Sequence, residues 1–180
     1  MAWHPVPSRR FRALATTAAV AVSLMGAGCT ADAPPAEESA TPPDSQAAAV
    51  LGVVQEFLDG LAAQDSAAFA RTLLAEGSAH SVEMRPGREA GRLRSRTGAQ
   101  DAATIGVPGP AMVERIRDPE IRVMGRAAVV WAPYDFWVDG AWSHCGTDIF
   151  TLADTPSGWI ITSVTYTLET DGCSPPPLVP

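Results

Sequence analysis

Residues 129–173 read VVWAPYDFWVDGAWSHCGTDIFTLADTPSGWIITSVTYTLETDGC. Two short turn sequences, Asp139-Gly140 and Thr155-Pro156-Ser157-Gly158, separate three runs rich in Trp, Tyr, Phe, Val and Ile. An Asp-Gly pair between such runs is a strong hairpin signal, because both residues tolerate the positive φ of a tight turn. The stretch therefore predicts an antiparallel meander with strands over Ile121–Val138, Ala141–Ala153 and Trp159–Glu169.

Two amphipathic helices are expected ahead of this meander. Between Ala47 and Ala63, apolar residues recur at spacings of three and four and form one stripe. Asp44 or Ser45 is available as the N-cap of this helix, and Asp65 as the N-cap of a second helix over Ser66–Ala75. The stripe consists of Val50, Val54, Phe57, Leu58 and Leu61.

The middle of the chain has weaker patterns. We expect a first strand over His80–Met84 and either a loop or a short edge strand over Arg88–Arg96. Asp101–Ile105 and Ala111–Ile116 each look like a single helical turn. No internal repeat is present.

The first 29 residues have the pattern of a secretory signal. Arg9, Arg10 and Arg12 precede a short apolar run over 13–24, and small residues then lead into Cys29. The ending Gly-Ala-Gly-Cys resembles a bacterial lipobox, which predicts lipidation of Cys29 and an exported, membrane-anchored protein facing outward. Ordinary signal cleavage, giving a secreted protein, and an uncleaved anchor are the alternatives.

Residues 30–46 are dominated by Pro, Ala, Glu, Ser and Asp and contain no large apolar side chain. Such a segment cannot bury enough surface to offset its ordering entropy, so we expect a disordered linker. Residues 174–180 form a similar flexible tail. One domain over residues 47–173 remains, which is a usual size for a single compact unit.

The charge pattern excludes several partners. The chain carries a formal net charge of −7, and removal of a signal that holds three Arg and no acidic residue leaves −10. An acidic protein without a basic stripe is not expected to bind nucleic acid. Cys29 is thus the only expected membrane attachment. No phosphate-binding loop, nucleophile motif or metal-ligand spacing occurs, so no cofactor and no metal are expected.

Four segments resemble a known superfamily: PGPAMVERIRDPEIRV at 108–123, VVWAPYDFWVDG at 129–140, SHCGTDIFTL at 143–152 and GWIITSVTYT at 158–167. With the two helices they resemble the nuclear transport factor 2-like superfamily, and within it the lumazine-binding branch. The resemblance implies an α+β cone in which N-terminal helices pack on a curved antiparallel sheet. It also implies relatives that are ketosteroid isomerases, dehydratases or polyketide cyclases, and others without known activity.

The register of the two hairpins predicts which side chains share a face. With two-residue turns, Asp135 lies opposite His144 and Trp131 opposite Asp148. Since side chains alternate along a strand, one face would carry Trp131, Asp135, His144, Asp148, Thr165 and Glu169. The other would carry Tyr134, Phe136, Cys145, Ile149, Val164 and Tyr166.

His144 is the candidate general base, with Asp148 or Asp135 orienting it or supplying a proton. The alternative is that Asp135, His144 and Glu169 form an exposed cross-strand charge cluster, worth about 0.2–1 kcal/mol per pair. Candidate ligand-binding residues are Trp131, Tyr134, Tyr166 and His80. Cys145 and Cys173 either form a disulfide in the exported protein or remain two free thiols.

Two functions follow from these patterns. The first is an extracytoplasmic, lipid-anchored module that holds a small apolar or aromatic ligand or presents its sheet to a protein partner, without catalysis. The second is a cofactor-free isomerase, dehydratase or cyclase that uses a His/Asp general base in the cone. The family resemblance also implies a homodimer, with an interface built from Trp137, Trp142, Phe136 and Tyr134.

Overall fold

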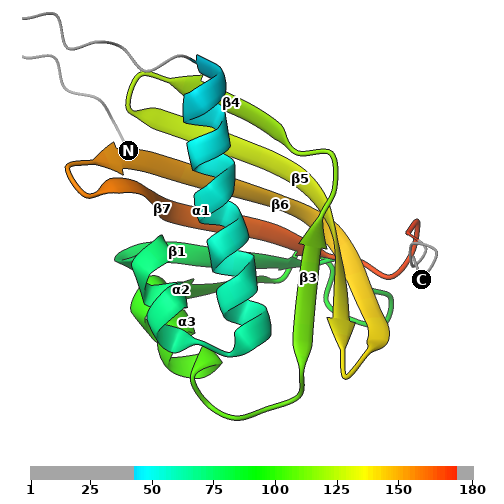
Figure 1. Cartoon of the computed structure of the whole chain (residues 1–180). Helices are drawn as coiled ribbons and strands as arrows, with labels where there is room; N and C mark the ends of the chain where they lie inside the picture. The colour runs from blue at the N-terminus through cyan, green and yellow to red at the C-terminus, as the bar shows by residue number, and fades with distance from the viewer. Residues whose placement is uncertain (1–42, 174–180) are drawn as a thin grey trace, which may run out of the picture. The chain divides into compact units, whose positions relative to one another are not determined.

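The structure, a computed structural model, describes residues 43–173. The predicted signal, the lipidation site Cys29, most of the predicted linker and the tail lie outside these residues. Three helices and seven strands follow one another along the described chain (Figure 1). In order they are α1 (Pro43–Ala63), α2 (Ser66–Thr72), β1 (Leu73–Glu83), β2 (Leu93–Thr97), α3 (Gly98–Ile105), β3 (Met112–Ile116), β4 (Glu120–Met124), β5 (Ala127–Val138), β6 (Ala141–Thr155) and β7 (Gly158–Leu168).

The strands form one curved sheet in the order β2-β1-β7-β6-β5-β3, and β4 pairs with β5 further along the edge that β3 uses. All neighbouring strands are antiparallel except β1 and β7, which run parallel. The sheet is therefore mixed, whereas the sequence predicted an antiparallel one. β1 follows α2 directly and is distant in sequence from β7, so no hairpin fixes their relative direction.

Helix α1 lies across one face of the sheet, with α2 and α3 beside its C-terminal end (Figure 1). Its apolar stripe is confirmed, since Val50, Val54, Phe57, Leu58 and Leu61 are all buried. The stripe packs on inward-facing residues of the central strands and forms a single core with Val130, Phe150, Leu152, Ile161 and Val164. None of the helices in the described part of the chain is long and apolar enough to span a bilayer.

Several expected boundaries are wrong. Helix α1 begins at Pro43, so neither Asp44 nor Ser45 is its N-cap. Asp65 does cap α2, because its side chain accepts hydrogen bonds from two backbone N–H groups. This helix ends at Thr72 instead of Ala75, since the buried Leu73 turns into extended backbone and pairs with β7.

Two errors in the middle of the chain affect the site. The segment expected as a helical turn at 111–116 is strand β3, paired with the last five residues of β5. The long strand expected over Ile121–Val138 is a hairpin, β4 and β5, which turns at Gly125 with a φ of 60°. β3 thus provides an additional inward-facing strand at the edge of the sheet.

Candidate functional site

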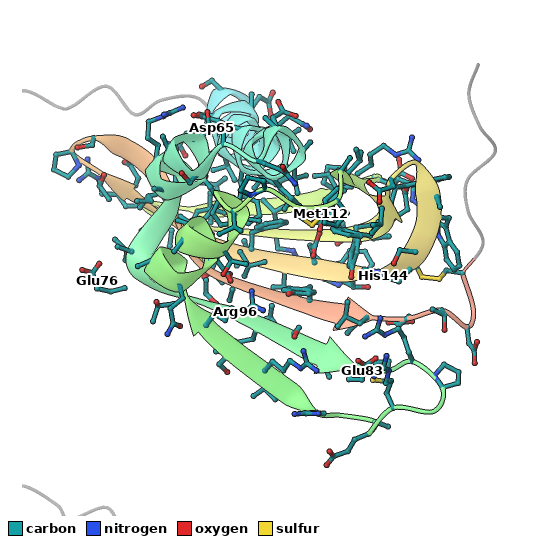
Figure 2. All side chains as sticks on the ribbon, turned by 90° about the horizontal axis from the view of Figure 1, so that it is seen from below. Asp65, Glu76, Glu83, Arg96, Met112 and His144 are labelled. Carbon is teal, nitrogen blue, oxygen red and sulfur yellow. A yellow bond between two sulfur atoms is a disulfide. The ribbon has the colours of Figure 1, made fainter. Side chains whose placement is uncertain are left out.

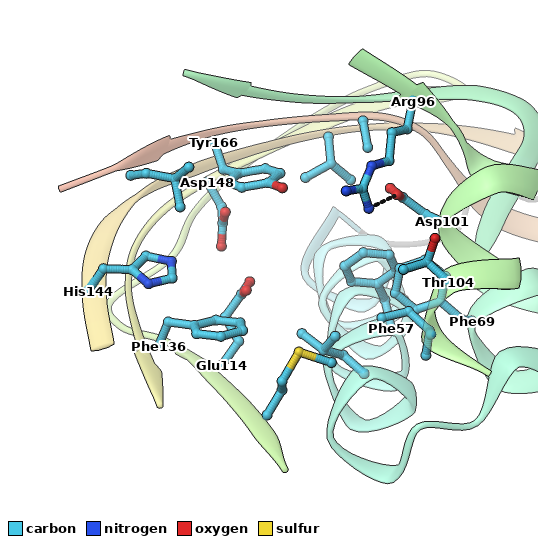
Figure 3. A pocket seen from close by; sticks show the side chains of 16 residues that line it. Phe57, Phe69, Arg96, Asp101, Thr104, Glu114, Phe136, His144, Asp148 and Tyr166 are labelled. Carbon is cyan, nitrogen blue, oxygen red and sulfur yellow. Dashed lines mark hydrogen bonds and ion pairs between the residues drawn. The ribbon is translucent and has the colours of Figure 1, made fainter. Parts of the chain in front are cut away.

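A cavity of about 250 Å³ lies between the helices and the concave face of the sheet. Most of its wall is apolar: Phe57, Leu61, Phe69, Ala79, Ile105, Met112, Phe136, Val164 and Leu168. The polar side chains at the wall are Arg96, Asp101, Thr104, Glu114, His144, Asp148 and Tyr166 (Figure 3). A hollow with mostly apolar walls and a few convergent polar groups is the usual form of a small-molecule site.

Two β-bulges decide which residues reach this cavity. The first hairpin starts in the predicted register, Val138 opposite Ala141 and Trp137 opposite Trp142, but Ser143 is then an extra residue and Phe136 pairs with His144. The second starts with Asp154 opposite Trp159, and Thr162 is then the extra residue. Each bulge shifts the later pairs by one residue relative to the predicted register. Beyond each bulge, the residues of the two strands that share a face are therefore not the predicted ones.

The predicted sharing of faces is therefore wrong. Beyond the bulges, Asp148 pairs with Ala132 and Tyr166 instead of Trp131 and Thr165, and Cys145 pairs with Glu169. The inward face carries His144 and Asp148 together with Tyr134, Phe136, Val164 and Tyr166. Asp135 and Trp131 lie on the outward face with Ile149.

Glu114 and Asp148 form the acidic part of the cavity. Their carboxyl groups point toward one another from β3 and β6 (Figure 3). Asp148 is 1% exposed, whereas Glu114 is half-buried because it faces the open cavity. Asp148 Oδ2 faces the Glu114 carboxyl and has no other hydrogen-bond partner among the described residues.

Burial and mutual repulsion keep this pair protonated at unusually high pH. Burial is the main cause that raises the pKa of Glu114 to about 7, while hydrogen bonding to Asp148 lowers it and the charge of Asp135 raises it. Burial likewise raises the pKa of Asp148 well above its ordinary value, and both the charge and the hydrogen bond of Glu114 add to this. Both carboxyl groups therefore keep their protons to higher pH than free carboxyl groups do, and Glu114 loses its proton only near pH 7, as expected when two like charges share an apolar site.

His144 lies beside the pair but is a weak base. Its ring stacks on Phe136 with 4.7 Å between centroids and meets the edge of Tyr134. The pKa of His144 is lowered to about 4, mainly by burial and then by the charge of Arg85, although Glu83 opposes this. His144 is therefore neutral at physiological pH and can accept or donate a hydrogen bond through its ring. Nδ1 is 3.0 Å from the hydroxyl of Ser143.

The wall across the cavity from the acidic pair carries Arg96 and Asp101, whereas Tyr166 lies beside Asp148 on the neighbouring strand β7 (Figure 3). Arg96 donates a hydrogen bond from Nη1 to Asp101 Oδ1 at 3.2 Å (Figure 3). Burial raises the pKa of Asp101, and the hydrogen bond from Arg96 opposes this rise. Burial also raises the pKa of Tyr166, so its hydroxyl stays protonated and can donate into the cavity.

Glu83 and Arg85 form a separate ion pair near His144, at the end of β1 (Figure 2). Arg85 donates from Nε to Oε1 at 2.7 Å and from Nη2 to Oε2 at 2.6 Å. This two-fold hydrogen bond is the main reason that the pKa of Glu83 is lowered to about 2. The charges of Glu83 and Arg85 therefore balance one another.

Four residues named from the sequence do not line the cavity. Tyr134 is buried on the inward face, but its hydroxyl donates to the carbonyl of Thr167 at 2.6 Å. Asp135 is a structural anion on the outward side. Trp131 is 40% exposed on that side, and His80 is hydrogen-bonded through Nδ1 to Ser95 Oγ at 2.8 Å. Of the predicted residues, only His144, Asp148 and Tyr166 come together at the cavity.

Asp135 holds the edge strand β3 in place. It is 1% exposed and accepts hydrogen bonds from Nε and Nη2 of Arg115 at 3.1 and 2.7 Å. Trp137 also donates its indole N–H to the same carboxylate, and Arg117 lies 3.9 Å from the other oxygen. Since Arg115 and Asp135 face each other across the two strands, the pair fixes the register that points Glu114 inward.

Glu114 is the residue that sequence reasoning missed. Reading 111–116 as a helical turn left no reason to consider it, although Met112, Glu114 and Ile116 alternate with Val113 and Arg115 as strand residues do. Arg96, Asp101 and Phe69 were missed because their convergence depends on how β2, α3 and α2 fold back over the sheet. Cys145 and Cys173 are joined by a disulfide in the structure, with Cα atoms 6.4 Å apart.

No model of a known protein family and no curated protein matches this sequence. Solved structures do match in three dimensions. A nuclear transport factor 2-like superfamily protein from Salmonella enterica aligns with a TM-score of 0.56 at 18% identity, over 73% of this chain and 96% of that one. The chain has a nuclear transport factor 2-like fold.

Other members of this fold align equally well. A nuclear transport factor 2-like protein of unknown function from Shewanella baltica has a TM-score of 0.56 at 18% identity, over 73% of this chain and 100% of that one. A proposed dehydratase of the nuclear transport factor 2-like family from Streptomyces avermitilis has a TM-score of 0.55 at 15% identity, over 71% and 98%. At these identities the structural similarity shows the fold. The function has to be argued from the residues of the site.

Proposed function

We propose that this nuclear transport factor 2-like domain binds a small, largely apolar molecule in the cavity between its helices and sheet. The observation that carries the proposal is the hollow itself: about 250 Å³, with nine apolar residues in its wall and a few polar groups that converge on it. The finer assignment, to the lumazine-binding branch, rests on the sequence segments alone. That branch name is no argument that lumazine is the ligand.

The location outside the cytoplasm belongs to the same proposal and rests on the sequence of residues 1–29. A signal ending in Cys29, followed by a Pro- and Ala-rich linker, would tether the domain to the outer side of a membrane. A disulfide between Cys145 and Cys173 suits an oxidising compartment. In cell fractionation, Cys29→Ala should move the protein from the membrane to the soluble fraction. An unchanged distribution would contradict the tether.

Ligand capture tests the binding function. The protein is exposed to a cell extract and purified, and the mass of the protein with any bound molecule is measured by native mass spectrometry. Wild type should retain a small molecule, and Ala79→Trp, which fills the cavity wall from β1, should lose it. Ala127→Trp, at an exposed position on β5, is the matched control and should retain the molecule. Equal retention by both Trp variants would place the molecule outside the cavity and refute the proposal.

A second candidate function is proton transfer, as in a cofactor-free isomerase, dehydratase or cyclase. Asp148 would donate, Glu114 would accept, and the Tyr166 hydroxyl would stabilise a developing oxyanion. His144, with a pKa of about 4, would position the substrate instead of acting as the base.

Isotope exchange separates the two functions. The captured molecule is incubated in deuterium oxide with wild type and with Glu114→Gln. If the domain transfers protons, the wild type should introduce deuterium at one carbon and the variant should be slower by about 100-fold or more. If the domain only binds, the molecule should be returned without carbon-bound deuterium by both proteins.

A further inference from the structure

The cavity contains a negative charge that the described residues do not balance. Glu114 is ionised once the pH rises above about 7, so the pair then carries a negative charge. The nearest cations are already engaged, since Arg96 pairs with Asp101 and Arg85 with Glu83. His144, beside the pair, is neutral.

A charge in such a place needs a partner. Moving an ionised carboxylate out of water is costly unless it is paired and hydrogen-bonded. The Asp148 carboxyl points into the cavity at 1% exposure, and Oδ2 has no hydrogen-bond partner among the described residues other than the Glu114 carboxyl. At low pH a second proton neutralises the pair, and at higher pH a cationic group between the two carboxyl groups would do the same.

The remaining wall indicates what kind of cation fits. Four aromatic side chains, Phe57, Phe69, Phe136 and Tyr166, line the cavity, and aromatic rings attract organic cations through their faces as well as their apolar bodies. In residues 43–173, no group of three or more His, Cys, Asp or Glu side chains is arranged to hold a metal ion. The net charge of −7 also attracts cations toward the protein.

We infer that the ligand of this cavity is an aromatic or alicyclic amine, whose ammonium group lies between Glu114 and Asp148 while its ring lies against the aromatic wall. The inference rests on the proposed small-molecule binding and names its ligand class. An ammonium group donates up to three hydrogen bonds, which suits two carboxyl groups that face each other. An anionic ligand would add to a charge that the cavity already fails to balance.

The test compares probes of one shape and different charge. Phenethylamine, the uncharged phenethyl alcohol and the anion hydrocinnamate are titrated into the full-length chain by calorimetry at about pH 8. The amine should bind at least about tenfold more tightly than the alcohol, the ratio expected when hydrogen bonds to a charged group replace neutral ones. Hydrocinnamate should bind most weakly. The affinity of the amine should also fall by about tenfold or more between about pH 8 and about pH 5, as Glu114 takes up its proton.

The matched variants are Glu114→Gln/Asp148→Asn, which removes both charges and keeps both shapes, and Asp154→Asn. Asp154 is a carboxylate on the same strand as Asp148, but it pairs with Arg126 away from the cavity. The double variant should lose the preference for the amine, and Asp154→Asn should keep it. If the double variant fails to fold, the pH dependence of the wild type decides.

Two results would overturn the inference: an alcohol that binds as tightly as the amine, or a preference for the amine that survives in the double variant. Binding of none of the probes would overturn it as well. Small-molecule binding itself would still stand in each case if native mass spectrometry shows a molecule that Ala79→Trp loses and Ala127→Trp keeps.

Discussion

Glu114 illustrates how position sets the chemistry of a side chain. A Glu on the outward face of β3 would be ionised at neutral pH, whereas Glu114 faces an apolar cavity and another carboxyl group. Its pKa therefore rises from 4.5 to about 7. The same residue type one position away would carry a permanent charge in solvent and have no connection to the cavity.

This shift has a consequence for stability. Between about pH 4.5 and about pH 7 the folded chain binds more protons at Glu114 than the unfolded chain does, so the free energy of unfolding falls as the pH rises through this window. In Glu114→Gln this fall should be missing. We expect the free energy of unfolding of the variant to exceed that of wild type by about 1–3 kcal/mol at about pH 8. At about pH 4 this difference should disappear.

Urea unfolding at both pH values measures the difference. His144 contributes the opposite dependence, because its lowered pKa makes the unfolded chain bind more protons between about pH 6.5 and about pH 4. Subtracting the wild-type free energy of unfolding from that of the variant removes the contribution of His144, which is the same in both proteins. Glu120→Gln, an exposed carboxyl group on β4, is the control. A stability difference that is the same at both pH values would show that Glu114 is not perturbed.

At the scale of elements, the turns of the meander were predictable from sequence and the bulges were not. Asp139-Gly140 forms the expected turn because a positive φ is required at both positions and both residues tolerate it. Neither Ser143 nor Thr162 is a residue type that predicts a β-bulge. Their bulges are stabilised by contacts made after folding, such as the hydrogen bond from the Thr162 hydroxyl to the carbonyl of Thr151 at 3.0 Å. Of the seven candidate site residues named from the sequence, three therefore line the cavity.

The edge strand β3 depends on a single anion. Arg115→Ala should leave the buried Asp135 with the Trp137 indole N–H and the more distant Arg117, which is then its nearest positive charge, so we expect a loss of about 2–4 kcal/mol in the free energy of unfolding. Because β3 forms the rim that carries Glu114, hydrogen exchange of its backbone amides should accelerate as well. Arg122→Ala on the neighbouring strand β4 should change neither quantity. Unaltered exchange in Arg115→Ala would contradict this role of Asp135.

The disulfide is a second fixed point, near the start of β6, where Cys145 lies opposite Asp135. It joins the strand to Cys173 across 28 residues and holds the chain after β7 against the outward face. Reduction should lower the free energy of unfolding by about 2–4 kcal/mol, which thermal melts with and without reductant would record. The double variant Cys145→Ala/Cys173→Ala should melt like the reduced protein, and reductant should not change its melting temperature. A wild-type melt unaffected by reductant would mean that the bridge does not form.

At the scale of the whole molecule, the outward face of the sheet has an exposed apolar patch. Val129, Trp131 and Ile149 are 41%, 40% and 39% exposed, and they lie side by side on β5 and β6. The residues that the sequence suggested for an interface are mostly unavailable, since Tyr134 and Phe136 point inward and Trp137 is bound to Asp135. A homodimer, which stays a prediction, would use the patch instead.

Sedimentation tests this prediction. We expect a dimer that buries about 800 Å² per partner, and Trp131→Glu should shift it to monomer by placing a charge in the patch. Met124→Glu, at an even more exposed apolar residue in the β4–β5 hairpin, should leave the dimer intact. Monomer at all concentrations for wild type would exclude the interface.

The extra residues Ser143 and Thr162 also bear on how such a domain can change over evolutionary time. Loss of either codon would remove the extra residue and leave the pairings beyond it unchanged, because Phe136 would still lie opposite His144 and Thr151 opposite Ser163. His144 and Asp148 would keep their places at the cavity. A lineage that carries this fold can therefore gain or lose one residue at a bulge, which changes the length of the chain and leaves the ligand site as it was.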